Sequence, residues 1–223
     1  MVEITIRKRP RTEAVITQRK FFKKTARGKV IKVLRERYLR DDVACGIEGC
    51  RECPTTSEET LPVNGDQRHQ LYPNGHIVLP DTNVFLAQME LVESDLFSPP
   101  IILLQTVLEE VRHRSLPLYN RLKALTKADD KRIWVFYNEY RSETAIIREE
   151  NETPNDRNDR GIRKATEWYN THISLTRPPV RGRPPPKLPT VVLLTEDAGN
   201  RQKAEQSGIA TISGEYTSST RLH

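Results

Sequence analysis

The sequence has few cysteines, no long apolar run and a modest apolar content, and each shortage excludes a class of protein. Three cysteines in 223 residues is an odd number, which argues against a disulfide framework and suits a reducing compartment. No apolar stretch approaches the roughly 20 residues that span a bilayer, and the N-terminus lacks the apolar core of a secretory signal. We therefore expect an intracellular, soluble protein with no membrane partner.

Acidic residues are scarce at the start of the chain. Residues 1–40 hold 14 Lys or Arg and 3 Asp or Glu, whereas the rest of the chain holds 22 and 27. The formal net charge of +6 therefore hides a basic arm on a mildly acidic body. Such an arm either binds an anionic partner, such as RNA or an acidic protein surface, or is a solvated tail.

Composition divides the chain into an N-terminal appendage and one larger domain. With hydrophobic residues at 36% and charged residues at 30%, part of the chain is expected to be extended or exposed. We predict a disordered basic tail, a basic hairpin with a cysteine-rich knuckle, a polar linker, an α/β domain and a short C-terminal tail, over residues 1–14, 15–54, 55–74, 75–212 and 213–223.

The predicted hairpin lies in the basic arm. β-type residues flank a turn at Ala26-Arg27-Gly28-Lys29, so we expect strands over residues 14–24 and 29–34. An isolated hairpin is only marginally stable in water, and this one therefore needs a partner surface.

From Gly75 onward, strand-type and helix-type segments alternate, which predicts a mostly parallel sheet flanked by helices. The predicted strands cover residues 77–80, 101–105, 133–138, 190–194 and 209–212. The predicted helices cover residues 84–92, 106–113, 118–126, 155 or 156 to 172, and 198–206. Thr106 and Glu109 have capping-box spacing, so we expect Thr106 to cap its helix. A Pro-rich basic segment, residues 177–189, is expected to be a surface loop.

Acidic residues follow several of these strands. Asp81 and Asp197 come directly after a strand, and Glu110 lies one turn into the helix after the second strand. Asp159 lies one turn before Ile162, at the edge of the apolar stripe of the long helix, and we rank it ahead of Asp156. Ligands of open α/β sheets bind outside the carboxyl ends of the strands, so these acids are placed where chemistry can occur.

Several carboxylates at one sheet edge repel one another, and a divalent cation relieves that repulsion. Hard cations such as Mg²⁺ or Mn²⁺ prefer oxygen ligands. A site of this kind can activate water and polarise a phosphoryl group. The competing interpretation of each single residue is a helix cap or a solvated carboxylate, but four such residues at one edge favour a metal site.

Four motifs carry a resemblance to the PIN domain. They are L-P-D-T-N-V-F-L, L-E-E-V-R-H-R, N-E-T-P-N-D-R-N-D-R-G-I-R-K and V-L-L-T-E-D, in this order. Together with an upstream C-x4-C-x2-C knuckle, they resemble the N-terminal region of the catalytic ribonuclease subunits of the eukaryotic RNA exosome. These subunits are RNase II/R-like proteins with an added PIN domain. The resemblance covers residues 15–212.

The resemblance implies a metal-dependent endoribonuclease that cuts single-stranded RNA. It implies that Mn²⁺ or Mg²⁺ is held by Asp81, Glu110, Asp159 and Asp197, and that the sheet has strand order 3-2-1-4-5. It further implies that the hairpin and the knuckle dock on the exosome core, and that the protein acts in the nucleus, including the nucleolus, and in the cytoplasm.

The sequence departs from the family pattern in two places. The last acidic motif is T-E-D where the family more often has T-N-D, so Glu196 adds a charge beside Asp197. The sequence also ends at His223, without the OB-type and exonuclease domains of the family. We therefore expect no processive exonuclease activity from these residues.

The three cysteines have the spacing of zinc ligands. Zinc in a structural site takes four nitrogen or sulfur ligands, and Cys45, Cys50 and Cys53 supply three. The sequence leaves the fourth open among five histidines, His69, His76, His113, His172 and His223. The resemblance points to His172. Such a site would fasten the N-terminal arm to the larger domain.

Two other functions compete with the endoribonuclease. The first is a non-catalytic docking module that tethers a nuclease to the exosome core. The second is an aspartyl phosphotransferase, which is disfavoured because its D-x-D motif would need a carboxylate where Asn83 stands. Three basic residues near the acids are candidates either for binding the RNA backbone or for surface ion pairs: Arg112, Arg157 and Arg160.

Overall fold

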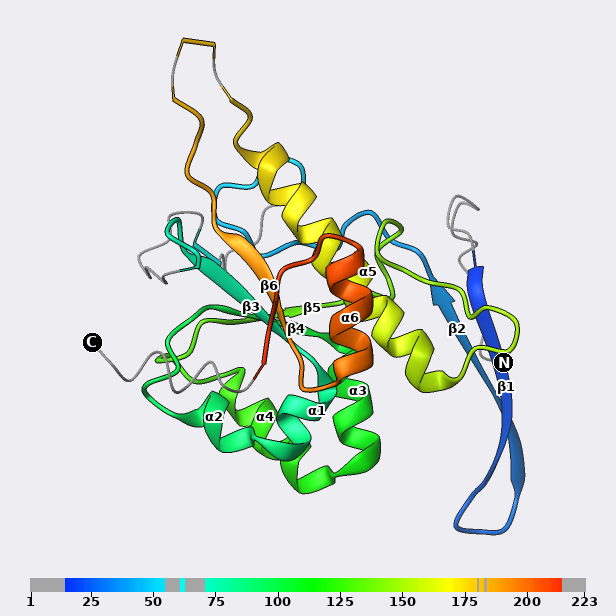
Figure 1. Cartoon of the computed structure of the whole chain (residues 1–223). Coiled ribbons are helices and arrows are strands. Elements are labelled where there is room, and N and C mark those ends of the chain that lie inside the picture. Colours follow the sequence, from blue (N-terminus) through cyan, green and yellow to red (C-terminus); the bar gives the residue numbers. More distant parts are fainter. Residues whose placement is uncertain (1–14, 55–60, 63–70, 180, 183, 214–223) are drawn as a thin grey trace.

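The computed structural model describes residues 15–54, 61–62, 71–179, 181–182 and 184–213 (Figure 1). The predicted basic tail, most of the predicted linker and residues 214–223 lie outside the described part. The described chain forms an α/β body, with a two-stranded hairpin that extends from one side of it. No helix in this part is long and apolar enough to cross a membrane.

The body is built on a five-stranded sheet in which every pair of neighbouring strands is parallel, with the order β5-β4-β3-β6-β7. This confirms the predicted order 3-2-1-4-5. All side chains of the central strand are buried, which explains its continuous apolar sequence. The strands are β3 His76–Pro80, β4 Ile101–Leu104, β5 Ile133–Phe136, β6 Thr190–Leu194 and β7 Thr211–Ile212.

Two predictions about the first helices are wrong. The predicted helix over residues 84–92 is two short ones, α1 Thr82–Ala87 and α2 Met89–Glu93, because the backbone of Gln88 leaves the helical region at φ −138° and ψ 43°. Thr106 does not cap the next helix. That helix, α3 Gln105–Arg114, starts directly from its strand, and the Thr106 hydroxyl hydrogen-bonds with the buried Asn138.

The remaining helices begin at residues with capping side chains. Ser115 caps α4 Leu116–Leu125, Thr153 caps α5 Pro154–Thr176, and Asp197 caps α6 Ala198–Gln206. The predicted apolar stripe of the long helix α5 is present, and four of its buried members are Ile162, Ala165, Tyr169 and Ile173. In Figure 1, α5 and α6 lie beside each other across the sheet, whereas α1, α2 and α4 gather at its other side.

The hairpin and the loop after it connect to the body in different ways. Strands β1 Val15–Lys24 and β2 Val30–Tyr38 pair antiparallel, as predicted, and their turn points away from the body (Figure 1). The following loop enters the core, since Cys45 and Ile47 are buried. Leu61, from the predicted linker, is also fully buried and exchanges backbone hydrogen bonds with this loop. The cysteine-containing loop is therefore packed on the α/β body.

Replacing Gly46 by Ala is expected to destabilise this packing by at least about 2 kcal/mol. Gly46 has φ +75°, and an added Cβ would lie 2.2 Å from Cδ2 of Trp134 on β5. The matched control is Gly49→Ala, which has similar strain at φ +69° but no atom within 4 Å. Thermal denaturation should show a clearly larger loss for Gly46→Ala. Equal losses would mean that the close approach to Trp134 contributes nothing.

Candidate active site and candidate metal centre

Asp81 occupies the turn between the central strand and α1. Its side chain is 2% exposed and accepts a hydrogen bond from Thr195 Oγ1 at 2.7 Å and from the backbone N–H of Asn83 at 3.2 Å. Burial raises the pKa of Asp81, the hydrogen bonds oppose this effect, and the charge of Glu110 adds to it. This carboxylate is therefore fixed in orientation but costly to hold as an anion without a cation.

Glu110 is held by side chains from three helices. Its carboxylate accepts from Thr82 Oγ1 and Asn158 Nδ2, both at 3.0 Å, and pairs with Arg114 at 2.7 Å. These partners come from α1, α5 and α3. Glu110 is thus positioned by the tertiary fold, and not by its own helix alone.

Asp197 follows β6, the strand next to the one that ends at Asp81. It caps α6 by accepting from the backbone N–H of Asn200 at 2.9 Å. Its own N–H donates to Thr195 Oγ1 at 3.1 Å, and the Thr195 hydroxyl donates to Asp81. A single buried threonine therefore links the two acids that stand at the ends of adjacent strands.

Asp159 lies on the first half of α5, where Asn155 Nδ2 donates to it at 3.2 Å. Burial, together with the negative charges of Asp81, Asp197 and Glu110 and against the opposing charge of Arg163, raises the pKa of Asp159 to about 7. Asp159 is therefore close enough to each of the other three acids to be repelled by its charge. Asp156, the second-ranked candidate, is exposed and hydrogen-bonds with Thr153 at its own helix end.

The burial of Asp159 and its repulsion by the other acids predict that Asp159→Asn stabilises the metal-free protein at alkaline pH. The folded-state pKa of Asp159 is raised above its ordinary 3.8, so wild-type stability falls as the pH rises from about 4 to about 7. Asn carries no charge and removes this loss, which we put at about 1–2 kcal/mol after allowing for solvent screening of a partly exposed group.

Thermal melts in a chelator test this prediction. The variant should melt several degrees above the wild type at pH 8, and the difference should vanish near pH 4. A variant that is less stable at pH 8 would contradict mutual repulsion among the acids.

The donor set of the acid cluster fits a hard divalent cation, because it consists of carboxylate oxygens whose repulsion a cation would relieve. The acids are nevertheless a looser group than the cysteines. Among the described residues, the group whose ligand atoms all lie within 4.8 Å of one another consists of the three cysteines and His172.

Sequence reasoning missed three residues around the acids: Thr195, Arg163 and Asn200. Asn200 is buried and accepts a hydrogen bond from Arg163 Nη1 at 2.5 Å. Thr195 and Asn200 stand two residues before and three residues after Asp197, so their positions were a usable signal. Glu196, by contrast, is exposed and accepts a hydrogen bond from Gln88 Nε2 at 3.5 Å.

The three basic candidates differ in their surroundings. Arg157 pairs with the buried Glu139 at 2.7 Å, and Arg160 pairs with Glu152 at 2.8 Å. The guanidinium of Arg112 is exposed and lies over the ring of Tyr119. Two of the three therefore take part in ion pairs within the chain.

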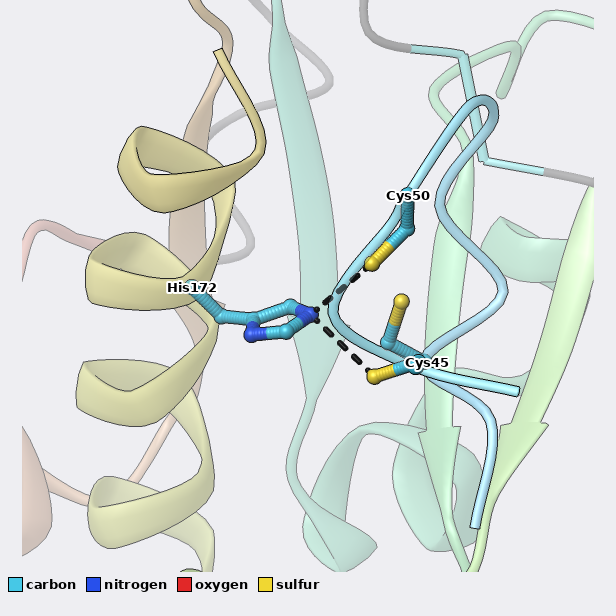
Figure 2. A group of neighbouring side chains, drawn as sticks. Cys45, Cys50 and His172 are labelled. Carbon is cyan, nitrogen blue, oxygen red and sulfur yellow. Dashed lines mark hydrogen bonds between the residues drawn. The ribbon is translucent and has the colours of Figure 1, made fainter. Parts of the chain in front are cut away.

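The second cluster brings together Cys45, Cys50, Cys53 and His172. Figure 2 shows His172, on α5, with its ring directed toward the loop that carries Cys45 and Cys50. The Nε2 atom of His172 lies 3.3 Å from the sulfur of Cys50 and 3.3 Å from that of Cys53. The four residues that the sequence and the resemblance selected thus lie together, although His172 follows Cys53 by 119 positions in the chain.

Two further side chains fix this cluster. The ring of His172 stacks on Trp168 with centroids 4.4 Å apart, and the guanidinium of Arg141 lies 4.6 Å from the Trp168 ring. Arg141 also donates to the sulfur of Cys53 at 3.2 Å and to the carbonyl of Val43 at 2.6 Å. Trp168 stands four residues before His172, so helical spacing was a signal for it.

The thiols have an environment that suits a metal. A hydrogen bond from Cys45, together with His172 and Arg141, lowers the pKa of Cys53 to about 4 against the effect of burial. Burial raises the pKa of Cys50, and the hydrogen bond with Cys53 together with burial raises that of Cys45. Three sulfurs and one imidazole nitrogen are the donor set of a tetrahedral structural zinc site, which these residues fit.

The other histidines have different surroundings. His76 is buried in β3 with Tyr72 beside it, and His113 is exposed, with Nδ1 2.6 Å from the Glu109 carbonyl. His69 and His223 lie outside the described residues.

Comparison with known proteins relates the chain to PIN domains. The model of the PIN domain family matches residues 78–215. The chain is 40% identical over 205 residues to exosome complex exonuclease RRP44 of Mus musculus, covering 90% of this chain and 20% of that protein. It is 34% identical over 209 residues to exosome complex exonuclease dis3 of Schizosaccharomyces pombe, again covering 20% of the relative. The chain therefore spans about a fifth of the length of these relatives.

Solved structures give the same picture. The structure of the T. brucei RRP44 PIN domain superposes with a TM-score of 0.64 at 30% identity, covering 82% of this chain and 97% of that one.

Proposed function

The chain belongs to the PIN domain family and is related to the PIN regions of exosome nucleases, and from this premise we propose that it is a metal-dependent endoribonuclease for single-stranded RNA. Asp81, Glu110, Asp159 and Asp197 are its catalytic residues and hold Mn²⁺ or Mg²⁺. The observation that carries the proposal is the hydrogen-bond network of the acids: Thr195 links Asp81 with Asp197, and Thr82 and Asn158, the neighbours of Asp81 and Asp159 in the sequence, both donate to Glu110.

The residues around the acids support this role. Thr195 and the N–H of Asn83 orient the Asp81 carboxylate, and Thr82 and Asn158 orient that of Glu110. Carboxylates that are fixed before the ion arrives need little reorganisation, as expected of a site that holds a metal in a defined place. A bound divalent cation would activate water and stabilise charge on the phosphoryl oxygens.

The test is a single-stranded RNA with a 5′ label and a blocked 3′ end, incubated with the chain at increasing Mn²⁺. We expect internal fragments whose yield rises with Mn²⁺ and disappears with a chelator. A chain that binds Mn²⁺ but leaves this RNA intact would overturn the proposal.

A docking role on the RNA exosome core is the second function that we propose. It is supported by the relatives, which are named as components of the exosome complex, and by the hairpin, on which Phe22, Val30 and Ile31 are exposed. Exposed apolar side chains close together mark interaction surfaces. Zinc held by the cysteines and His172 would fasten the arm to the body. A nuclear and cytoplasmic location belongs to the same proposal. The two functions are compatible.

A further inference from the structure

A cavity of about 680 Å³ borders Glu110, one of the four acids. Glu110 and Asn158, which donates to Glu110, are part of its wall. The cavity continues over the first turn of α5 at Thr153 and Asn155. Its volume is in the range of sites that hold a small molecule or a single residue of a polymer. An occupant of this cavity therefore lies next to one of the proposed catalytic acids, Glu110.

The basic arm forms another part of this wall. Arg37, on β2, lines the cavity and pairs with Glu109 at 3.1 Å. It also pairs with the buried Glu139, which Arg157 holds from the other side at 2.7 Å. The contact between Arg37 and Glu109 joins residues 72 positions apart in the chain. The arm is thus anchored to the cavity wall by two ion pairs, one of them with the buried Glu139.

Cationic groups at the mouth of the cavity suit an anionic occupant. Arg114 is half exposed and Arg148 is exposed, and both line the cavity. The 23-residue helix α5 begins here, so the positive end of its dipole adds to these charges. The side chain of Ile147, 74% exposed, offers an apolar face at the rim. Phosphate groups next to flat apolar bases are the chemistry of single-stranded nucleic acid.

We propose that this cavity seats a nucleotide of single-stranded RNA adjacent to the scissile phosphate, and that Arg37 of the N-terminal arm completes its wall. The inference rests on the proposed function, since it takes RNA as the substrate of the neighbouring acids. RNA is favoured over a peptide because the cavity borders the acids and carries arginines at its mouth. The arm then has a part in substrate binding as well as in docking.

The first test measures binding of a fluorescent single-stranded RNA to the whole chain in a chelator, so that no cleavage occurs. Arg148→Ala should weaken binding by about 3- to 10-fold and lower the salt dependence by about one charge. Arg37→Ala should weaken it at least as much. The matched control is Arg132→Ala, which removes an exposed arginine directly before β5, at the sheet edge opposite the acids and outside the cavity lining, and it should bind as the wild type does.

A second measurement does not depend on the folding of the Arg37 variant. RNA that contains 4-thiouridine is photo-crosslinked to the wild-type chain, and the crosslinked peptides are identified by mass spectrometry. We expect peptides that contain Arg37 or residues 146–148. Crosslinks confined to other surfaces would overturn the inference, as would unchanged binding by Arg148→Ala or no RNA binding by the wild type.

The two proposals fail in distinguishable ways. If the wild type binds RNA through the cavity but does not cut it with Mn²⁺, the endonuclease proposal fails and the cavity assignment stands. If the wild type cuts RNA while the Arg148 and Arg37 variants bind and cut equally well, the cavity assignment alone fails.

Discussion

Asp159→Asn is expected to lower Mn²⁺-dependent cleavage of single-stranded RNA by at least about 100-fold, the upper end of what loss of a supporting group costs a metal site. The reason is that Asp159 faces the charges of Asp81, Glu110 and Asp197. An amide in its place removes one negative ligand and keeps the shape of the side chain. Single-turnover cleavage of a labelled RNA gives the measurement.

The matched control is Asp156→Asn. Asp156 lies one turn earlier on the same helix, is exposed, and contacts Thr153. This variant should cut RNA at close to the wild-type rate. Equal losses in the two variants would show that negative charge along α5 matters and that Asp159 has no special place in the site.

The Asp159→Asn variant also separates cleavage from docking. Asp159 lies on the body near Asn155, whereas the exposed apolar side chains of the hairpin include Phe22 and Val30. We therefore expect Asp159→Asn to bind the exosome core as well as the wild type in a pull-down with purified core subunits. Loss of core binding together with cleavage would contradict the separation of the two surfaces.

His172→Ala is expected to release zinc and to loosen the N-terminal arm. The Nε2 atom of His172 lies 3.3 Å from two cysteine sulfurs, and no other histidine of the described residues belongs to this cluster. Three cysteines without the imidazole leave a tetrahedral site one ligand short. Elemental analysis should find about one zinc per wild-type chain and a large loss in the variant.

The matched control for this change is His113→Ala, which removes an exposed histidine outside the cysteine cluster, with Nδ1 2.6 Å from the backbone carbonyl of Glu109 on its own helix. Its zinc content should equal that of the wild type. Hydrogen exchange over residues 43–54 reports on the arm and should rise in His172→Ala alone. Unchanged zinc content in His172→Ala would contradict the assignment of His172 as a zinc ligand.

The positions of two of the four acids in the fold could be predicted from local patterns. Asp81 and Asp197 directly follow buried strands, and each also caps the helix that comes next. Parallel strands bring such positions to one edge of the sheet. The choice of Asp159 over Asp156 depended on the apolar stripe of α5, and the charges that raise the pKa of Asp159 agree with that choice.

Local patterns failed where tertiary contacts override them. The capping-box spacing at Thr106 predicted a helix start there, but the helix begins at Gln105, directly after its strand. Thr106 instead hydrogen-bonds with Asn138, 32 residues away. No Gly or Pro stands next to Gln88, so no signal in the sequence marked the helix break there. The contacts of Arg37 with Glu109 and of Arg141 with Cys53 join residues 72 and 88 positions apart. No periodicity within a short window carries that information.

Whether the four acids form an endonuclease site can be tested with a circular single-stranded RNA incubated with the chain and Mn²⁺. A circle has no ends, so an exonuclease cannot attack it. We expect the wild type to convert circles to linear RNA and Asp159→Asn to leave them closed. Circles that stay intact with the wild type, or that are opened equally by the variant, would contradict this expectation.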